Sequence, residues 1–472
     1  MPADIPVLRL ADLARCGRDV ALPLEIALAP AGALRLEAWL RVLPGRRYVG
    51  QGVWQDAAGG RRRVLAKLLV GKKAARQFAR EREGARLLAA QGLPTPTLLA
   101  AECEADSGGW LLFEFLENAR APGAEAIHEA VRAIARLHER GLWQNDLHPD
   151  NLLAQDGRIY FVDGGDIGAE MPGQALSPDR ALDNLGMFFA QWPVRMEAGL
   201  SEALASYRAQ NPVSGAEMGI AALRQAVRRQ REARLRAWLK KIVRECSDFC
   251  VRKKGAFGFC VARRDSEKIL APLLTDPDAF IDAGQLRKDG GTATVARVEV
   301  SGREFIVKRY NIKHLRHGLS RCWRRSRAWR AWREGNRLLA LGIPTARPLA
   351  LIERRWLWFS GVAYLVTEYL PGEDILQRLQ AENMTARAPE IAAVDTLFAD
   401  LARARLSHGD MKGHNLIWRE EAAQWALIDL DAMRAHRLES AFERAHRRDC
   451  RRFLRNWPPD SPLSRHFSRR FK

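Results

Sequence analysis

Cysteine is scarce in this chain: there are seven among 472 residues, an odd number with no disulfide-like framework. We therefore expect reduced thiols in a cytosolic protein. Cys246 and Cys250, four residues apart with no histidine nearby, are expected on one helix face and not in a zinc site. No run of about 18 uncharged apolar residues occurs, which excludes a membrane-spanning helix. The N-terminus lacks the basic-then-apolar layout of a secretory signal, so we do not expect export.

Acidic residues are outnumbered, with 56 Asp and Glu against 76 Lys and Arg, a formal charge of +20. The excess is clustered in 221–245, 311–333 and 444–472. The stretch 311–333 holds eight Lys and Arg, three Trp and no acidic residue. Because indole rings suit a membrane–water interface and guanidinium groups pair with phosphate, this composition predicts contact with an anionic membrane surface. Charge alone also fits nucleic acid, but the interleaved tryptophans favour lipid, and we expect no nucleic-acid partner.

An internal repeat organises the chain. REGARLLAAQGLPTP at 82–96 corresponds to REGNRLLALGIPTA at 333–346, and further matches follow in the same order, about 250–266 residues apart. This predicts two copies of one domain, residues 1–240 and 241–472, joined by an Arg-rich helical segment.

Within each copy, strand patterns come first and helical patterns dominate later. RRVLAKLLV around Lys67 and EFIVKRY around Lys308 are expected strands, and the helices that follow are expected to end at Gly92 and Gly342. The predicted fold class is therefore α+β, with two tandem protein-kinase-like domains, each a small β-rich lobe followed by a larger helical lobe.

Five residue types recur in the same order in both copies: a strand Lys, a helical Glu, an Asp, an Asn five positions later, and an Asp that ends an apolar strand. They are Lys67, Glu83, Asp146, Asn151 and Asp163 in the first copy, and Lys308, Glu334, Asp410, Asn415 and Asp429 in the second. Phosphoryl transfer needs such groups, since a Lys oriented by a Glu clamps the phosphates, an Asn and a carboxylate hold Mg²⁺, and another carboxylate receives the acceptor's proton. The order is that of the protein-kinase signature, and it predicts ATP and Mg²⁺ as cosubstrates.

The sequence identifies a glycine-rich, phosphate-binding loop less clearly than it identifies the five residues above. Gly290 and Gly291 are expected at a turn between two strands, where backbone N–H groups approach phosphate. The first copy offers Gly50 and Gly52 in YVGQGVW. Neither copy has a complete G-x-G-x-x-G, and Gly290 and Gly291 also fit an ordinary hairpin turn.

The long activation segment and A-P-E stretch of protein kinases are missing. A helical aspartate follows each strand-end Asp after only 20 residues, at Asp183 and Asp449. So short a segment leaves little room for a peptide platform, and we expect the acceptor to be a small molecule or a sugar hydroxyl. Asp183 and Asp449 are expected to have a structural role, as helix N-terminal charges or in buried hydrogen bonds to the catalytic loop.

With these motifs placed, the stretches HGDMKGHNLIW, LIDLDAMR and VKRYN resemble the lipopolysaccharide core kinase family of Gram-negative bacteria, whose members phosphorylate heptose or Kdo residues. The resemblance covers most of 285–460 and, more loosely, 45–195, where NDLHPDNLL and FVDGGD are also similar to aminoglycoside and choline phosphotransferases. It implies two-lobed kinase folds that use ATP and Mg²⁺. It also implies a lipid-linked lipopolysaccharide core acceptor and a peripheral location at the cytoplasmic face of the inner membrane.

Carried over residue by residue, the resemblance makes Asp410 the base, makes Asn415 and Asp429 the Mg²⁺ ligands, and makes Lys308 the phosphate-binding partner of Glu334. The corresponding roles in the first copy fall to Asp146, Asn151, Asp163, Lys67 and Glu83.

One pair of residues departs from the pattern, and the role of one further residue stays open. Gln144 and Asn145 precede Asp146 where the family has a His-containing motif like Ser407-His408-Gly409. Asp431 fits both a metal-binding residue and an exposed loop carboxylate.

Other functions also stay open. They are a protein Ser/Thr kinase, a pseudokinase scaffold with one or both copies inactive, and a basic RNA-binding module.

Overall fold

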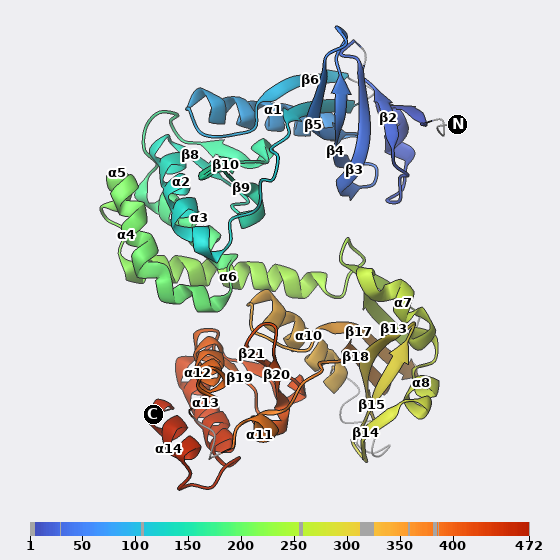
Figure 1. Ribbon diagram of the computed structural model, residues 1–472, viewed down its shortest axis with the longest axis vertical. Coiled ribbons are helices and arrows are strands. Elements are labelled where there is room, and N and C mark those ends of the chain that lie inside the picture. Colours follow the sequence, from blue (N-terminus) through green and yellow to red (C-terminus); the bar gives the residue numbers. More distant parts are fainter. Residues whose placement is uncertain are drawn as a thin grey trace. The chain divides into compact units, whose positions relative to one another are not determined.

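The computed structural model describes residues 5–28, 30–104, 108–253, 258–311, 325–356, 359–380, 385 and 387–471 (Figure 1). The chain divides into two compact units. The first unit comprises Met1–Gln191 and Ala198–Gln230, and the second comprises Trp192–Glu197 and Arg231–Lys472. This boundary and the one expected after residue 240 both fall within α6 (Ile220–Lys241).

The sheet of the first unit has seven strands in the order β1-β2-β3-β4-β5-β7-β6. Only β1 and β2 pair in parallel. Apolar residues alternate between two faces, since Ala66 and Leu68 of the Lys67 strand belong to one core cluster and Leu69 to another. The strands are β1 (Val7–Arg9), β2 (Leu24–Ala27), β3 (Ala33–Leu43), β4 (Arg47–Gln55), β5 (Arg61–Leu69), β6 (Leu98–Glu104) and β7 (Gly108–Glu114).

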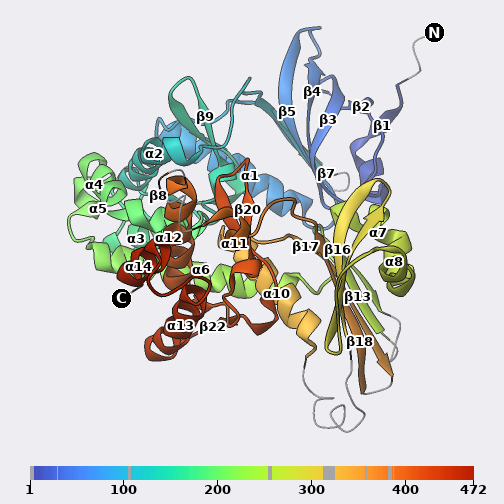
Figure 2. The same cartoon turned by 60° about the horizontal axis from the view of Figure 1, so that its bottom comes forward.

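The sheet of the second unit also has seven strands, in the order β12-β13-β17-β18-β16-β15-β14, all antiparallel. Figure 2 shows it with α7 (Arg264–Thr275) and α8 (Pro277–Ala283) beside it. Leu351 packs into the core that includes the helix α10 (Arg327–Ala340), while Ala350 and Ile352 face the α7–α8 side. The strands are β12 (Phe249–Lys253), β13 (Gly258–Arg263), β14 (Gln285–Gly290), β15 (Ala293–Val300), β16 (Arg303–Tyr310), β17 (Pro348–Trp356) and β18 (Phe359–Glu368).

Five strands follow the same order in both units. A hairpin (β3–β4, or β14–β15) is followed by the lysine strand (β5, or β16) and then by two strands in reversed order (β7-β6, or β18-β17). The additional strands lie at different edges, β1 and β2 beyond the hairpin in the first unit and β12 and β13 beyond β17 in the second. The repeat read from the sequence is thus matched by a repeated sheet topology.

The helix after each lysine strand ends where the sequence indicates. The hydroxyl of Ser326 caps α10 by accepting a hydrogen bond from the backbone N–H of Trp329 at 2.9 Å. Both α1 (Ala74–Ala90) and α10 are followed by a glycine with positive φ, 67° at Gly92 and 69° at Gly342. This left-handed conformation ends a helix at little cost only when the residue lacks a Cβ.

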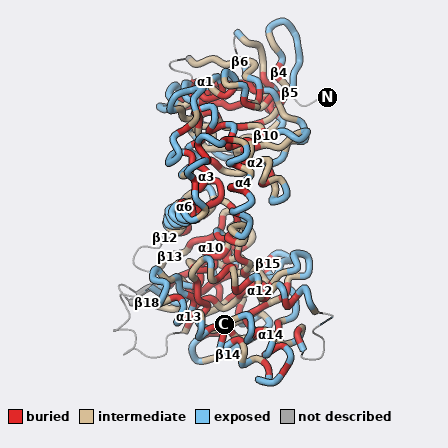
Figure 3. The backbone as a smooth tube through the Cα atoms, turned by 90° about the vertical axis from the view of Figure 1, so that its left-hand side faces the viewer, coloured by how far each residue is buried: buried red, intermediate tan, exposed pale blue. Residues whose placement is uncertain are grey.

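Helices dominate the remainder of each unit. Two two-stranded sheets in each unit flank the loop that contains Asp146 or Asp410. The α+β fold class expected from the sequence is confirmed, and buried residues run through the interior of both units (Figure 3). None of the helices in the described ranges has the length and apolar character that a membrane crossing requires. The elements that hold the loops are α2 (Ile127–Glu139), β8 (Leu142–Gln144), β9 (Leu152–Gln155), β10 (Arg158–Phe161), β11 (Ile167–Ala169) and α3 (Pro178–Ala190), and then α12 (Ala388–Arg403), β19 (Leu406–Ser407), β20 (Leu416–Arg419), β21 (Gln424–Leu427), β22 (Arg434–Ala435) and α13 (Glu439–Leu454).

Two sequence expectations need correction. Cys246 lies in a bend and Cys250 in β12, so these thiols do not share a helix face. Of the basic stretch 311–333, residues 312–324 lie outside the described residues. In the described part Trp332 is fully buried in the protein core, so it is not available to a lipid surface.

Candidate functional site

In the first unit, Lys67 is held by two carboxylates. Its Nζ donates to Glu81 Oε2 at 2.6 Å and to Asp163 Oδ1 at 2.9 Å. Burial alone would lower the pKa of Lys67, but the attraction of the two carboxylates outweighs it and raises that pKa. Burial raises the pKa of Glu81, whereas at Asp163 the charge of Lys67 overcomes burial and holds the pKa well below its usual range. The two carboxylates therefore keep the buried ammonium group of Lys67 charged.

The helical partner of Lys67 is Glu81 and not Glu83, and the structure corrects the expected pairing. Glu83 is exposed and accepts hydrogen bonds from Arg86 at 2.8 and 3.0 Å. Residues two apart on a helix point to different sides, and the rotation of α1 turns Glu81 inward.

Close backbone packing brings α1 to the lysine. A Cβ on Gly84 would lie 1.8 Å from the carbonyl oxygen of Gly164, so α1 packs directly on the turn after Asp163. The backbone N–H of Gly165 donates to Glu81 Oε2 at 3.1 Å. Glycine at 84 and 164 is thus a condition for the Lys67–Glu81 contact.

The loop of Asp146 is supported by amide side chains. Asn151 Nδ2 donates to the carbonyl of Asp146 at 2.7 Å, which leaves its Oδ1 as a ligand oxygen. The buried Gln144 donates through Nε2 to the carbonyl of Val162 at 2.8 Å. Asn184 donates to the carbonyl of Gln144 at 2.7 Å.

Asp183 does not take part in this support. It is exposed and pairs with Arg229, so its expected bond to the loop is absent and Asn184 makes the contact. The sequence reading missed Asn184 because it stands next to the aspartate that the repeat singles out.

In the second unit, Lys308 also lies between two carboxylates, but both come from one loop. Its Nζ contacts Asp429 Oδ1 and lies 2.9 Å from Asp431 Oδ1. Asp431 is buried and also pairs with Arg327. Burial and the hydrogen bond to Asp431 raise the pKa of Asp429. Burial would also raise the pKa of Asp431, but the hydrogen bond to Asp429 and the charges of Lys308 and Arg327 outweigh it and lower that pKa.

Glu334 does not pair with Lys308, which corrects a second expected contact. It is buried and accepts from Arg337 at 2.6 Å and from Arg333 at 3.1 Å. Leu430 stands where the first unit has Gly164, and a Cβ on Gly335 would lie 3.5 Å from its Cδ1. A side chain thus separates α10 from this turn.

The catalytic-type loop of the second unit is held by a histidine and a buried aspartate. His408 Nε2 lies 3.0 Å from the carbonyl of Ile428, the counterpart of the Gln144 bond. Asp449 accepts from the backbone N–H groups of His408 at 2.6 Å and Gly409 at 2.9 Å. Burial lowers the pKa of His408 and raises that of Asp449. Asp449 therefore has the structural role expected for it.

Around Asp410 the geometry repeats that of the first unit and adds two cations. Asn415 Nδ2 donates to the carbonyl of Asp410 at 2.8 Å. The Asp410 carboxylate pairs with Lys412 at 3.2 Å and with Arg452. Neither cation was singled out in the sequence, although Lys412 stands only two residues after the expected base.

The glycines have different surroundings in the two units. Gly290 ends β14, and Gly291 and Thr292 form the turn to β15. Asn311 donates through Nδ2 to the carbonyl of Gly290 at 3.3 Å and through its backbone N–H to that of Thr292 at 3.2 Å. Gly50 and Gly52 lie inside β4, where a Cβ on Gly52 would meet the backbone of β3 at 2.1 Å. Because Gly50 and Gly52 have no side chains, β3 and β4 can approach closely enough to pair.

Arg47, beside the β3–β4 turn, reaches the first-unit cluster. Its Nη1 is 3.6 Å from Glu81 Oε1 and 3.8 Å from Asp163 Oδ1. The register of β4 and β5 places Arg47 where β15 has Ala293 in the second unit. The first unit thus has an additional cation at its lysine–carboxylate cluster.

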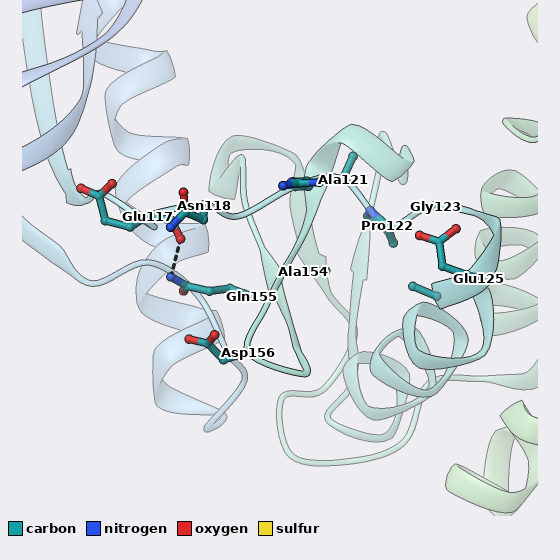
Figure 4. A pocket seen from close by; sticks show the side chains of 11 residues that line it. Glu117, Asn118, Ala121, Pro122, Gly123, Glu125, Ala154, Gln155 and Asp156 are labelled. Atoms are coloured by element: carbon teal, nitrogen blue, oxygen red, sulfur yellow. Dashed lines mark hydrogen bonds between the residues drawn. The ribbon is translucent and has the colours of Figure 1, made fainter.

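The second unit has a cleft of about 1170 Å³ at these residues. Asp410, Asp429 and Asp431 all line it, and Thr292 brings in the glycine turn. A separate hollow of about 540 Å³ in the first unit lies between the chain after β7 and the β9–β10 hairpin (Figure 4). None of the predicted site residues lines that hollow.

The donor set in each unit consists of hard oxygen atoms. In the described ranges no group of three or more His, Cys, Asp or Glu side chains is arranged to hold a metal. Mg²⁺ at a nucleotide site commonly takes only one or two carboxylates and completes its shell with phosphates and water. Asn415 with Asp429, and Asn151 with Asp163, fit that requirement.

Comparison with known proteins gives one family match. Residues 273–470, less than half of the chain and all in the second unit, match the model of the lipopolysaccharide kinase (Kdo/WaaP) family. This confirms the resemblance read from the motifs there. A solved structure of WaaP in complex with acyl carrier protein is similar at 21% identity over 45% of this chain and 86% of that chain, with a TM-score of 0.32. No curated protein matches the chain.

Proposed function

From the family match of the second unit, we propose that this unit is an ATP- and Mg²⁺-dependent kinase of a sugar hydroxyl, heptose or Kdo, in the lipopolysaccharide inner core. The observation that supports it best is a single cleft lined by Asp410, Asp429 and Asp431, within the matched residues. Lys308 contacts the last two of these aspartates. Because Lys308 contacts Asp429, the proposed metal ligand, both side chains can act on one triphosphate.

The proposed roles follow from these contacts. Lys308 binds the phosphates and Asp431 holds it in place. Asn415 and Asp429 hold Mg²⁺, which neutralises phosphate charge when bound. Asp410 accepts the proton of the acceptor hydroxyl as the acceptor oxygen bonds to the γ-phosphorus and the bond from that phosphorus to the bridging oxygen of ADP breaks. Positioning supplies much of the rate, because the loose transition state needs little covalent help.

For the first unit we propose nucleotide binding through Lys67, Asp163 and Asn151, with Asp146 as base. The repeated strand order and the equivalent amide–carbonyl bonds support this. A second candidate is a nucleotide-binding scaffold that does not transfer phosphate. It is favoured by Arg47, whose guanidinium lies 3.8 Å from Asp163, the carboxylate that a metal would need.

We also propose that the chain works at the inner face of the inner membrane, where it meets a lipid-linked acceptor. The basic stretch 311–333 would contact anionic lipid, although Arg327 and Arg330 bond to Asp431 and so belong to the cleft. The test is binding to anionic vesicles by a variant with Lys313, Arg316, Arg321 and Arg324 changed to glutamine. Undiminished binding would refute the membrane role of this stretch.

The function itself is tested by mass analysis of the core from cells that express Asp146→Ala, Asp410→Ala or the double variant. Loss of one phosphate with Asp410→Ala supports transfer by the second unit, and a further loss with Asp146→Ala supports transfer by the first. A core unchanged in all three contradicts the proposal. Phosphate appearing in protein and not in core oligosaccharide would favour a protein Ser/Thr kinase.

A further inference from the structure

We propose that the helical side of the second unit's cleft is an oxyanion-binding site, so that the acceptor already carries a phosphate or carboxylate near the hydroxyl that is phosphorylated. This rests on the proposed function and adds the class of acceptor. The observation behind it is an excess of arginine: eight arginines line the cleft against four aspartates.

The arginines divide into two groups by their partners. On the side of Lys308, Arg327 pairs with the Asp431 carboxylate and Arg330 donates to its backbone carbonyl at 3.1 Å. On the helical side, Arg452 pairs with Asp410. The charge nearest the phosphate-binding residues and the base is therefore largely compensated within the protein.

Of the five other cleft arginines, Arg325 lies over the Trp329 ring, 4.0 Å from its centroid, and four have no such compensation. These four are Arg434, Arg448, Arg451 and Arg455. No carboxylate among the residues that the structure describes lies within 4.0 Å of their guanidinium groups. The last three belong to α13 or its C-terminal end at spacings of three and four residues, which places them along one face. Guanidinium groups match carboxylate and phosphate oxygens with two parallel hydrogen bonds. This face therefore offers an anionic ligand several guanidinium groups, each able to donate two parallel hydrogen bonds.

The fold does not require these arginines. The corresponding helix of the first unit, α3, has no arginine after Arg180, and its later residues Leu185, Phe188 and Phe189 are buried core. Because both helices follow the same loop and support it through Asn184 or Asp449, the arginine face is an addition of the second unit. Its position beside Arg452 and Asp410 puts a bound anion next to the base and away from the Lys308 side.

The test uses the full chain with ATP and inner-core oligosaccharide in three forms: intact, dephosphorylated, and with its carboxyl groups reduced to alcohols. The variants are Arg448→Gln and Arg455→Gln. Arg447→Gln is the matched control, since Arg447 lies on the same helix outside the cleft lining. One lost charge-assisted hydrogen bond predicts a rise in acceptor KM of about ten- to a hundredfold, with ATP KM unchanged. The control stays at the wild-type value.

The two modified oligosaccharides show which anion is recognised. The form that lacks it has a raised KM with the wild type, and Arg448→Gln then has little further effect. Equal acceptor KM for wild type, Arg448→Gln and Arg455→Gln overturns the inference while leaving the proposed function in place. If no oligosaccharide is phosphorylated, the proposed function fails, and calorimetric titration with intact oligosaccharide still decides the anion site: equal affinity in wild type and Arg448→Gln would refute it.

Discussion

Glu81 of the first unit and Asp431 of the second accept equivalent hydrogen bonds from the strand lysine, at 2.6 and 2.9 Å, but come from different elements. Glu81 is on the helix α1, whereas Asp431 is two residues after Asp429. The residue two after Asp163 is Gly165, and a Cβ there would lie 2.9 Å from Glu81 Oε1. The first unit thus has room for only one of the two carboxylates, which makes the pair of positions interdependent there.

A double-mutant cycle in the first unit tests this dependence. Glu81→Ala leaves a buried ammonium with one carboxylate fewer and should lower the free energy of unfolding by about 3 kcal/mol. Gly165→Asp alone should also destabilise, because the new carboxylate meets Glu81. The double variant should be more stable than the sum of the two effects by about 1 kcal/mol or more, measured by urea unfolding. Simple additivity would contradict the account.

In the second unit, Asp431 and Glu334 should behave oppositely. Asp431→Asn removes a charge that holds Lys308, and we expect kcat/KM for phosphate transfer to fall about ten- to a hundredfold. Glu334→Gln loosens the contacts with Arg333 and Arg337 and should cost about 1–3 kcal/mol of stability with kcat/KM within about threefold of wild type. A larger kinetic loss for Glu334→Gln than for Asp431→Asn would show that Glu334 orients Lys308 after all.

Gln144 and His408 make the same hydrogen bond to the carbonyl before the strand-end aspartate. His408→Gln should therefore keep the loop, at a cost below about 1 kcal/mol. His408→Ala leaves the buried carbonyl of Ile428 without its donor and should cost about 1–3 kcal/mol. Thermal unfolding of both variants checks this, and equal losses would contradict the equivalence of the two side chains.

His138 should make the first unit sensitive to acid. It is fully buried between Tyr207 and Asn184, and burial lowers its pKa to about 4. The unfolded chain takes up this proton near pH 6.5, so stability is complete above that value and is lost as pH falls toward 4, by about 3 kcal/mol in all. Unfolding between pH 7 and 4 should show a shallower decline for His138→Gln. Parallel curves for variant and wild type would refute this.

The sequence predicted the parts of the site that depend on order along the chain. Strands around Lys67 and Lys308, helix ends at Gly92 and Gly342, and the Asp–Asn loops are local features, and the repeat made each visible twice. The structure shows the lysine of each unit in contact with its strand-end aspartate.

What the sequence did not predict depends on how elements pack. Glu83 and Glu334 share a motif, yet the rotation of each helix and the residue facing it, Gly164 or Leu430, decide which carboxylate reaches the lysine. Asp431 could be read as an exposed loop residue, but it is buried. The arginine face of the cleft was likewise hidden, because its members were indistinguishable from solvent-facing charge in a basic segment.

The most direct test of the central claim is transfer of γ-labelled phosphate from ATP to inner-core oligosaccharide by the purified chain, compared between wild type and Asp410→Asn. The account predicts label in the sugar with wild type and a loss of about 10²–10⁴-fold in the variant, since that is the typical contribution of a base positioned for the acceptor proton. Undiminished labelling by Asp410→Asn, or label found only in protein, would contradict it.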